Sequence, residues 1–89
     1  MEIGEGGILR IRNAARRIDL NIHLIGSRAK GTARANSDYD YAIPGINSKK
    51  WCKIKNSLPG SKSIADNLSN RIDLFKYLDE SLPFITITP

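Results

Sequence analysis

The sequence predicts an α+β (α/β layered) fold, in which a small mixed sheet of three or four strands carries helices packed on it. Two segments show the apolar spacing of amphipathic helices, and short β-branched runs such as NIHLIG and RIDLFKY stand between turns and polar segments. The chain has 89 residues, which is enough for one small hydrophobic core. We therefore expect residues 1–89 to form a single domain with its elements arranged in layers.

The first helix is predicted over residues 8–19, ILRIRNAARRID, because the apolar side chains from Ile8 to Ile18 recur at helical spacing. Arginines fill the opposite face, which is either simply solvated or contacts phosphate groups. The next run, residues 20–25, is β-branched and apolar and ends at Gly26, which favours a strand.

A short helix is predicted over residues 27–35. Ser27 is expected to be its N-cap, and Gly31 is expected to weaken or end it. Residues 38–43, DYDYAI, alternate in polarity at first and are closed by a Pro-Gly pair, which favours a second strand.

The second amphipathic helix is predicted over residues 48–58, SKKWCKIKNSL, with Asn47 or Ser48 as its N-cap. A Pro-Gly pair follows directly and ends it. The rest of the chain predicts a polar loop over residues 61–70 and two further strands over residues 71–77 and 84–88.

Composition excludes several kinds of site. The single cysteine, Cys52, rules out an internal disulfide and a zinc site built on thiolates. The single histidine, His23, lies inside a strand-like run, so we expect a packed or edge histidine rather than the base of a nucleophilic triad. No apolar run approaches the ~20 residues of a membrane span, so we expect no membrane partner. The formal net charge of +5 suits an anionic partner, although it also fits a merely soluble surface.

Two carboxylates, Asp38 and Asp40, stand one residue apart in the second predicted strand. Side chains alternate across a strand, so both point to one face, with Cα atoms about 6.5–7 Å apart. Carboxylates that face the same way repel each other, unless they are exposed or hold a cation such as Mg²⁺. Asp73 interrupts the third predicted strand and reaches the same patch if that strand lies beside the second. Three acids can then hold two divalent ions for displacement at phosphorus.

The segment before these acids has the features of a phosphate-binding loop. Gly26 lets the backbone turn closely, and Ser27 begins a helix whose first N–H groups and dipole attract anions. Arg28, Lys30 and Arg34 lie nearby to offset phosphate charge. Neither G-x-x-x-x-G-K-[ST] nor G-x-G-x-x-G after a strand occurs. We therefore expect a polyphosphate at this loop, bridged to the acids by Mg²⁺.

The run IGS at residues 25–27, followed after ten residues by DYDY at 38–41, resembles the signature of the polymerase-β-like nucleotidyltransferase superfamily. That signature is hydrophobic-Gly-[Gly/Ser], a spacer, Asp-x-[Asp/Glu] within a strand, and a third acid on another strand, a place that Asp73 fits. GSRAKGTARANSD, residues 26–38, is especially similar to the corresponding run of the minimal nucleotidyltransferases. The resemblance implies the nucleotidyltransferase fold.

The resemblance also implies a role for each matching residue. The residues expected to bind the nucleotide are Gly26, Ser27 and Arg28. The residues expected to be catalytic and to ligate metal are Asp38, Asp40 and Asp73. Asp73 would also help to activate the acceptor hydroxyl. The implied cofactors are two Mg²⁺ ions, with Mn²⁺ as a substitute.

The implied activity is transfer of an NMP from an NTP to a hydroxyl of RNA, such as tRNA, or of a protein. A looser similarity of the whole chain to nucleotidyltransferase domains of bacterial polymorphic toxins implies a toxin or effector. Such a domain acts in the cytoplasm, can be delivered within a secreted carrier, and has an immunity protein as partner. One alternative is an antitoxin that modifies its cognate toxin. Another is a non-catalytic module of this fold that binds nucleic acid or protein.

The plainest alternative is an exposed strand face in which Asp73 pairs with Arg71 or a lysine. The chain is also too short for the additional domain with which larger relatives bind the base and the acceptor. The choice of nucleotide and acceptor is therefore open at this point.

Overall fold

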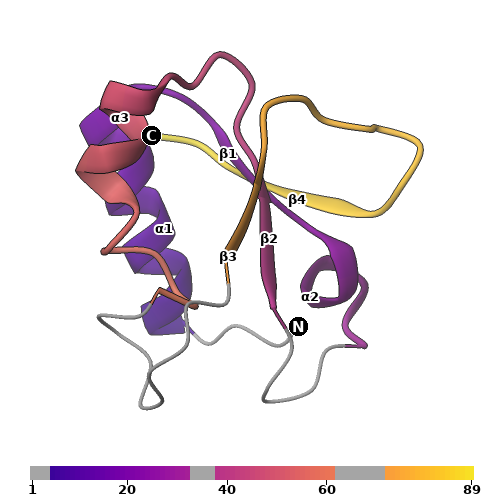
Figure 1. Ribbon diagram of the computed structural model, residues 1–89. Coiled ribbons are helices and arrows are strands. Elements are labelled where there is room, and N and C mark those ends of the chain that lie inside the picture. The colour runs from indigo at the N-terminus through magenta and orange to yellow at the C-terminus, as the bar shows by residue number, and fades with distance from the viewer. Residues whose placement is uncertain (1–4, 33–37, 62–71) are drawn as a thin grey trace.

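The computed structural model describes residues 5–32, 38–61 and 72–89, which form a mixed α+β fold around one four-stranded sheet (Figure 1). The elements of these segments are, in chain order, α1 (Glu5–Ile18), β1 (Ile22–Ile25), α2 (Gly26–Lys30), β2 (Tyr39–Ala42), α3 (Ser48–Ile54), β3 (Ile72–Phe75) and β4 (Phe84–Ile87). The predicted fold class is confirmed. The predicted loop over 61–70 lies, after Ser61, outside the described residues.

The sheet has the strand order β3-β2-β1-β4. β1 runs antiparallel to β2 and to β4, whereas β2 and β3 are parallel, so the sheet is mixed as predicted. The parallel pair is possible because α3 and a long connection separate β2 from β3 along the chain. In this register Asp40 lies opposite Ile25 on one side and opposite Asp73 on the other.

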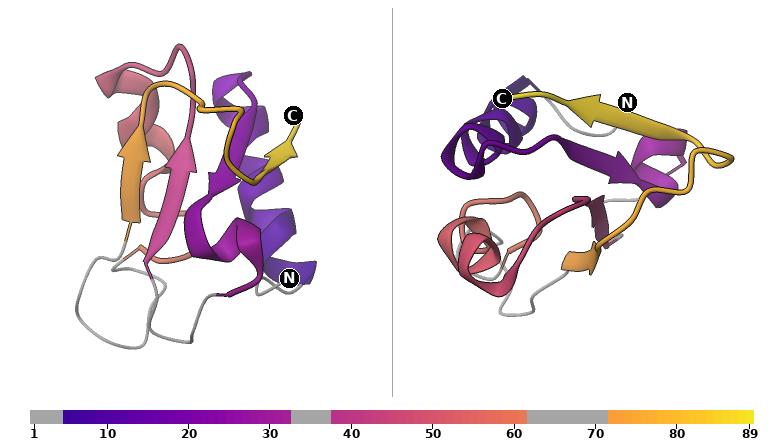
Figure 2. Two further views of the ribbon diagram at one scale, coloured as in Figure 1. Left: turned by 90° about the vertical axis from the view of Figure 1, so that its right-hand side faces the viewer. Right: turned by 90° about the horizontal axis from the view of Figure 1, so that it is seen from above.

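Helices α1 and α3 lie side by side on one face of the sheet, as Figures 1 and 2 show. The hydrophobic core lies between these helices and the strands. Its fully buried large side chains include Ile11, Ile22, Leu24, Tyr41, Ile43, Ile54 and Leu58. Because side chains alternate along each strand, the residues between the core positions point to the opposite face of the sheet, where Asp40 and Asp73 lie.

The ends of the helices differ in part from the sequence prediction. Asn47 caps α3, since its side chain accepts a hydrogen bond of 2.8 Å from the N–H of Lys50, and Gly31 ends α2 in the left-handed conformation; both were predicted. The prediction that Ser27 caps α2 is wrong, because the helix begins at Gly26 and has no side-chain cap bond. The helix predicted over 48–58 is also shorter than expected, because α3 ends at Ile54 and turns follow it.

Tyr41 fastens β2 to the turn after α3. Its side chain is fully buried and its hydroxyl donates a hydrogen bond of 2.7 Å to the carbonyl of Pro59. Tyr41→Phe leaves that buried carbonyl without its donor, so we expect the free energy of unfolding to fall by about 1–2 kcal/mol. Urea denaturation measures it, with Tyr77→Phe as the control because Tyr77 is exposed. Equal losses in both variants would contradict the assignment.

Candidate active site on the open face of the sheet

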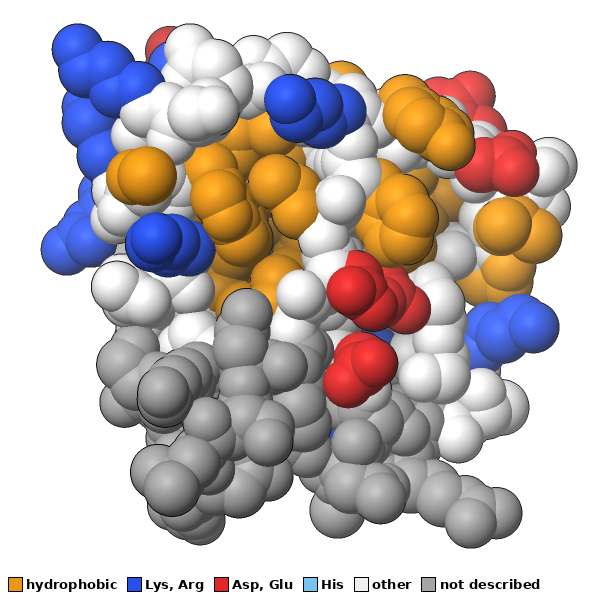
Figure 3. Space-filling model, in the orientation of Figure 1, with side chains coloured by type: hydrophobic (Ala, Val, Ile, Leu, Met, Phe, Trp, Pro, Cys, Tyr) orange, Lys and Arg blue, Asp and Glu red, His pale blue; other side chains and the backbone are white. Residues whose placement is uncertain are grey.

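Asp40 and Asp73 lie next to each other on the face of the sheet opposite α1 and α3, which we call the open face. They are register partners on the parallel strands β2 and β3, which lie about 4.8 Å apart. The condition stated from the sequence, that the third strand lies beside the second, is therefore met. Asp38 is exposed and stands one residue before β2. Figure 3 shows acidic side chains near the middle of the view, next to apolar ones.

The charge of Asp40 is unfavourable where it stands. Partial burial raises the pKa of its carboxyl group above the ordinary value of 3.8, and the charge of Asp73 raises it further. A hydrogen bond with the Asp73 carboxyl group and the charge of Asp38 act in the same direction on this pKa. The three acids are therefore electrostatically coupled, and a cation placed among them would relieve the repulsion.

This coupling predicts a pH dependence of stability in the absence of divalent ions. Because the pKa is raised in the folded state, folded Asp40 still holds its proton at pH values above 3.8, the ordinary pKa, where the unfolded chain has released it. The stability contributed by that proton is thus present at low pH and lost as pH rises through the raised pKa. Asp40→Asn has no such loss. We expect the stability gap between variant and wild type, measured by urea denaturation in EDTA, to widen as the pH rises above 3.8, the ordinary pKa of the carboxyl group. A gap independent of pH would contradict the coupling.

Among residues 5–32, 38–61 and 72–89, no group of three or more histidine, cysteine, aspartate or glutamate side chains is arranged to hold a metal ion. Asp40 and Asp73 are thus the part of the predicted acid set that the fold brings into contact. Asp38 is an exposed neighbour whose charge reaches Asp40.

Gly26 brings the start of α2 against the Asp40 carboxylate. Its φ of 71° lies in the left-handed region that favours glycine. A Cβ at this position would collide with the Oδ2 atom of Asp40, so only glycine lets the backbone approach the carboxylate this closely. The turn predicted at Gly26 is present, and it places Ser27 in the same pocket as Asp40.

Arg28 does not line this pocket. Only 5% of its surface is exposed, and its guanidinium carbon lies 4.0 Å from the centre of the Tyr39 ring. Tyr39 points away from Asp40 because neighbouring residues on a strand face opposite sides. This cation–π contact fastens α2 to β2, and the expected contact of Arg28 with nucleotide phosphate stays a prediction. Arg34 lies outside the described residues.

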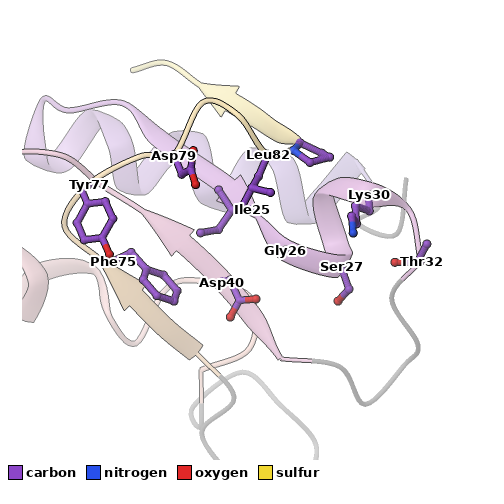
Figure 4. A pocket seen from close by; sticks show the side chains of 11 residues that line it. Ile25, Gly26, Ser27, Lys30, Thr32, Asp40, Phe75, Tyr77, Asp79 and Leu82 are labelled. Carbon is purple, nitrogen blue, oxygen red and sulfur yellow. The ribbon is translucent and has the colours of Figure 1, made fainter.

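A pocket of about 480 Å³ opens between α2, the sheet and the segment that joins β3 to β4. The strand ends and α2 contribute Ile25, Gly26, Ser27, Lys30, Thr32 and Asp40 to its lining. The other wall consists of Phe75, Tyr77, Asp79, Leu82 and Pro83 (Figure 4). Sequence reasoning missed this second wall. Its signal was the apolar and aromatic content of KYLDESLPF, which follows the third acid.

His23 is a packed histidine, as predicted. It lies on β1 between two neighbouring strands, with Nδ1 2.8 Å from the hydroxyl oxygen of Thr86 and its ring against the edge of Phe84. Burial lowers the pKa of its imidazole. Within the described part of the chain, no helix is both long enough and apolar enough to cross a membrane.

Comparison with known proteins leaves the function to be argued from this site. No protein-family model matches the chain, and no curated protein is significantly similar to it in sequence.

Proposed function

We propose that this protein is a nucleotidyltransferase, which moves a nucleoside monophosphate from an NTP to a hydroxyl group. The observation that carries the proposal is the pairing of Asp40 with Asp73 on adjacent parallel strands, directly beside the Gly26 turn. Asp40, Gly26 and Ser27 line one pocket, whose volume of about 480 Å³ suits a nucleotide-sized ligand. The IGS residues and Asp40 of the DYDY motif thus line the same pocket.

The two carboxylates fit a divalent cation. Burial raises the pKa of Asp40 most, and the charge of Asp73 raises it further; a cation between the two carboxylates would offset their repulsion. Mg²⁺ binds through one or two carboxylates together with substrate phosphates, and Mn²⁺ accepts the same oxygen ligands. When bound, the metal would neutralise charge on the phosphates and favour ionisation of the attacking hydroxyl. Asp38, one residue before β2, would supply a further ligand.

The proposed reaction balances as follows. The oxygen of the acceptor hydroxyl forms a bond to the α-phosphorus, and the bond from that phosphorus to the α–β bridging oxygen breaks. Pyrophosphate leaves with the electron pair. The hydroxyl proton would pass to a carboxylate, and the proposed acceptor of that proton is Asp73, the register partner of Asp40. Gly26 and Ser27 bind the departing phosphates, and Lys30, which lines the same pocket, offsets their charge.

The proposed acceptor is RNA, such as tRNA, or a protein, and the proposed setting is a bacterial toxin or effector domain that acts in the cytoplasm. An immunity protein is the partner expected in that setting. An antitoxin that modifies its cognate toxin uses the same chemistry on a protein acceptor. A non-catalytic binding module would need the same pocket but would release no pyrophosphate.

The test is incubation of the purified protein with Mg²⁺ and each common NTP, labelled at the α-phosphate, with total tRNA and cell lysate as acceptors. Asp38→Ala is run beside it. Label that moves to RNA or protein in the wild type, and not in the variant, supports the proposal and identifies nucleotide and acceptor class. Label transfer that is equal in both proteins would contradict the role of Asp38.

A further inference from the structure

We propose, on the basis of the proposed function, that the apolar wall of the pocket binds the nucleobase of the NTP. In this arrangement Tyr77 is the surface on which the base stacks, and Asp79 selects bases that carry amino donors, with guanine preferred. This apolar wall is the part of the pocket that the IGS and DYDY motifs do not explain.

The exposed apolar side chains of the molecule gather at this wall. Among the described residues, five large apolar side chains are exposed, and three of them line the pocket: Phe75 (40% exposed), Tyr77 (73%) and Leu82 (59%). Phe84, the fourth, directly follows Pro83, which also lines the pocket. Contiguous exposed apolar surface of this kind marks a binding site.

The two ends of the pocket differ in chemistry, and this difference fixes the kind of ligand. Figure 4 shows Ser27 and Lys30 on the α2 side, Tyr77 on the opposite side, and Asp40 between them. A ligand that fills the pocket must therefore have an anionic part at one end and a flat or apolar part at the other. A nucleoside triphosphate has this form, since every base offers a π-face to an aromatic side chain.

Asp79 is the polar group of the apolar wall, and it is held in one position. Its Oδ1 atom accepts hydrogen bonds from the N–H of Ser81 at 3.0 Å and from the Ser81 hydroxyl at 2.5 Å. These bonds lower the pKa of the Asp79 carboxyl group, which therefore stays ionised at neutral pH. An ionised carboxylate accepts hydrogen bonds and donates none.

A fixed acceptor discriminates between bases by their donors. The Oδ2 atom of Asp79, which accepts neither of the Ser81 bonds, is the acceptor for the base. Guanine offers it two adjacent donors, N1–H and the 2-amino group, whereas adenine and cytosine offer one amino group each. Uracil flanks its N3–H with two carbonyl oxygens, which a carboxylate repels. The geometry therefore predicts the order GTP first, ATP and CTP next, and UTP last.

The test compares dissociation constants of the four NTPs and of inorganic tripolyphosphate, in Mg²⁺ and without acceptor. Wild type is expected to bind GTP about tenfold more tightly than UTP, and Asp79→Asn, which adds a donor, to reduce that ratio to about threefold or less. Tyr77→Ala is expected to weaken every NTP about tenfold and to leave tripolyphosphate unchanged, while Tyr77→Phe binds as wild type. Leu9→Ala is the control, since Leu9 is an exposed apolar residue on α1.

The outcomes separate this inference from the proposed function. Loss of NTP affinity in Tyr77→Ala but not in Leu9→Ala, with tripolyphosphate binding kept and the GTP preference reduced in Asp79→Asn, supports the inference. NTPs that bind Tyr77→Ala and Asp79→Asn as tightly as wild type overturn the inference while the proposed function stands, because the wall would then serve an acceptor or a partner. A wild type that binds neither NTPs nor tripolyphosphate would overturn the inference together with the proposed function.

Discussion

Replacing Asp40 by asparagine is expected to abolish nucleotidyl transfer and also to remove the stabilisation that Mg²⁺ gives the wild-type chain. Asp40 lines the pocket and lies opposite Asp73 on the next strand. Residues that only orient a metal ligand already cost about 10- to 100-fold when replaced, so loss of the ligand itself should exceed about a hundredfold. At about 100 times its Kd, Mg²⁺ should stabilise the wild type by about 2.7 kcal/mol.

The same variant separates a functional acid from a structural one. In EDTA, Asp40→Asn should melt at or above the wild-type temperature, because the replacement relieves the repulsion between Asp40 and Asp73. Asp19→Asn is the matched control, since Asp19 is an exposed aspartate just after α1. Melting curves with and without Mg²⁺, together with label transfer, measure both effects. A variant that unfolds in EDTA would make Asp40 structural and contradict the account.

Gly26→Ala is expected to be the second most damaging substitution. It forces a Cβ onto a residue with φ of 71° and into the space of the Asp40 carboxylate. The backbone strain alone costs about 1–2 kcal/mol of stability. Displacement of Asp40 away from Asp73 should in addition remove Mg²⁺-dependent stabilisation and reduce transfer to the background of Asp40→Asn.

Gly31 provides a control of the same backbone geometry. Its φ is 79°, and a Cβ built there meets no atom within 4 Å. Gly31→Ala should therefore carry the strain of a left-handed alanine without touching the site. We expect both variants to lose similar stability in EDTA by urea denaturation, and Gly26→Ala alone to lose transfer. Equal loss of transfer in Gly31→Ala would mean that α2 acts only through its folding.

Much of the arrangement of the acids follows from local rules. Alternation along a strand places Asp38 and Asp40 on one face, and the interrupted run around Asp73 indicates where a third acid enters the sheet. Only the strand order decides that Asp73 sits beside Asp40, and that order depends on how α1 and α3 cover one face of the sheet. Local periodicity carries no information about such pairing.

Tertiary contacts account for the parts that the sequence did not predict. Arg28 follows the pattern of a phosphate ligand, yet its long side chain is buried against Tyr39, a residue eleven positions further along the chain. Ser27 is a good N-cap by propensity, but the left-handed Gly26 already lies inside the helix. Apolar content singles out the segment after β3, but only the packing of that segment beside the sheet makes it a wall of the pocket.

The most direct test of nucleotidyl transfer labels each NTP at either the α- or the γ-phosphate. The labelled NTPs are incubated with the protein in Mg²⁺, with tRNA and lysate as acceptors. We expect the α label to enter the acceptor and the γ label to appear only in pyrophosphate. Asp40→Asn should form neither labelled product. Transfer of the γ label to the acceptor, or no transfer of the α label from any NTP, would contradict the claim that Asp40 and Asp73 serve nucleotidyl transfer.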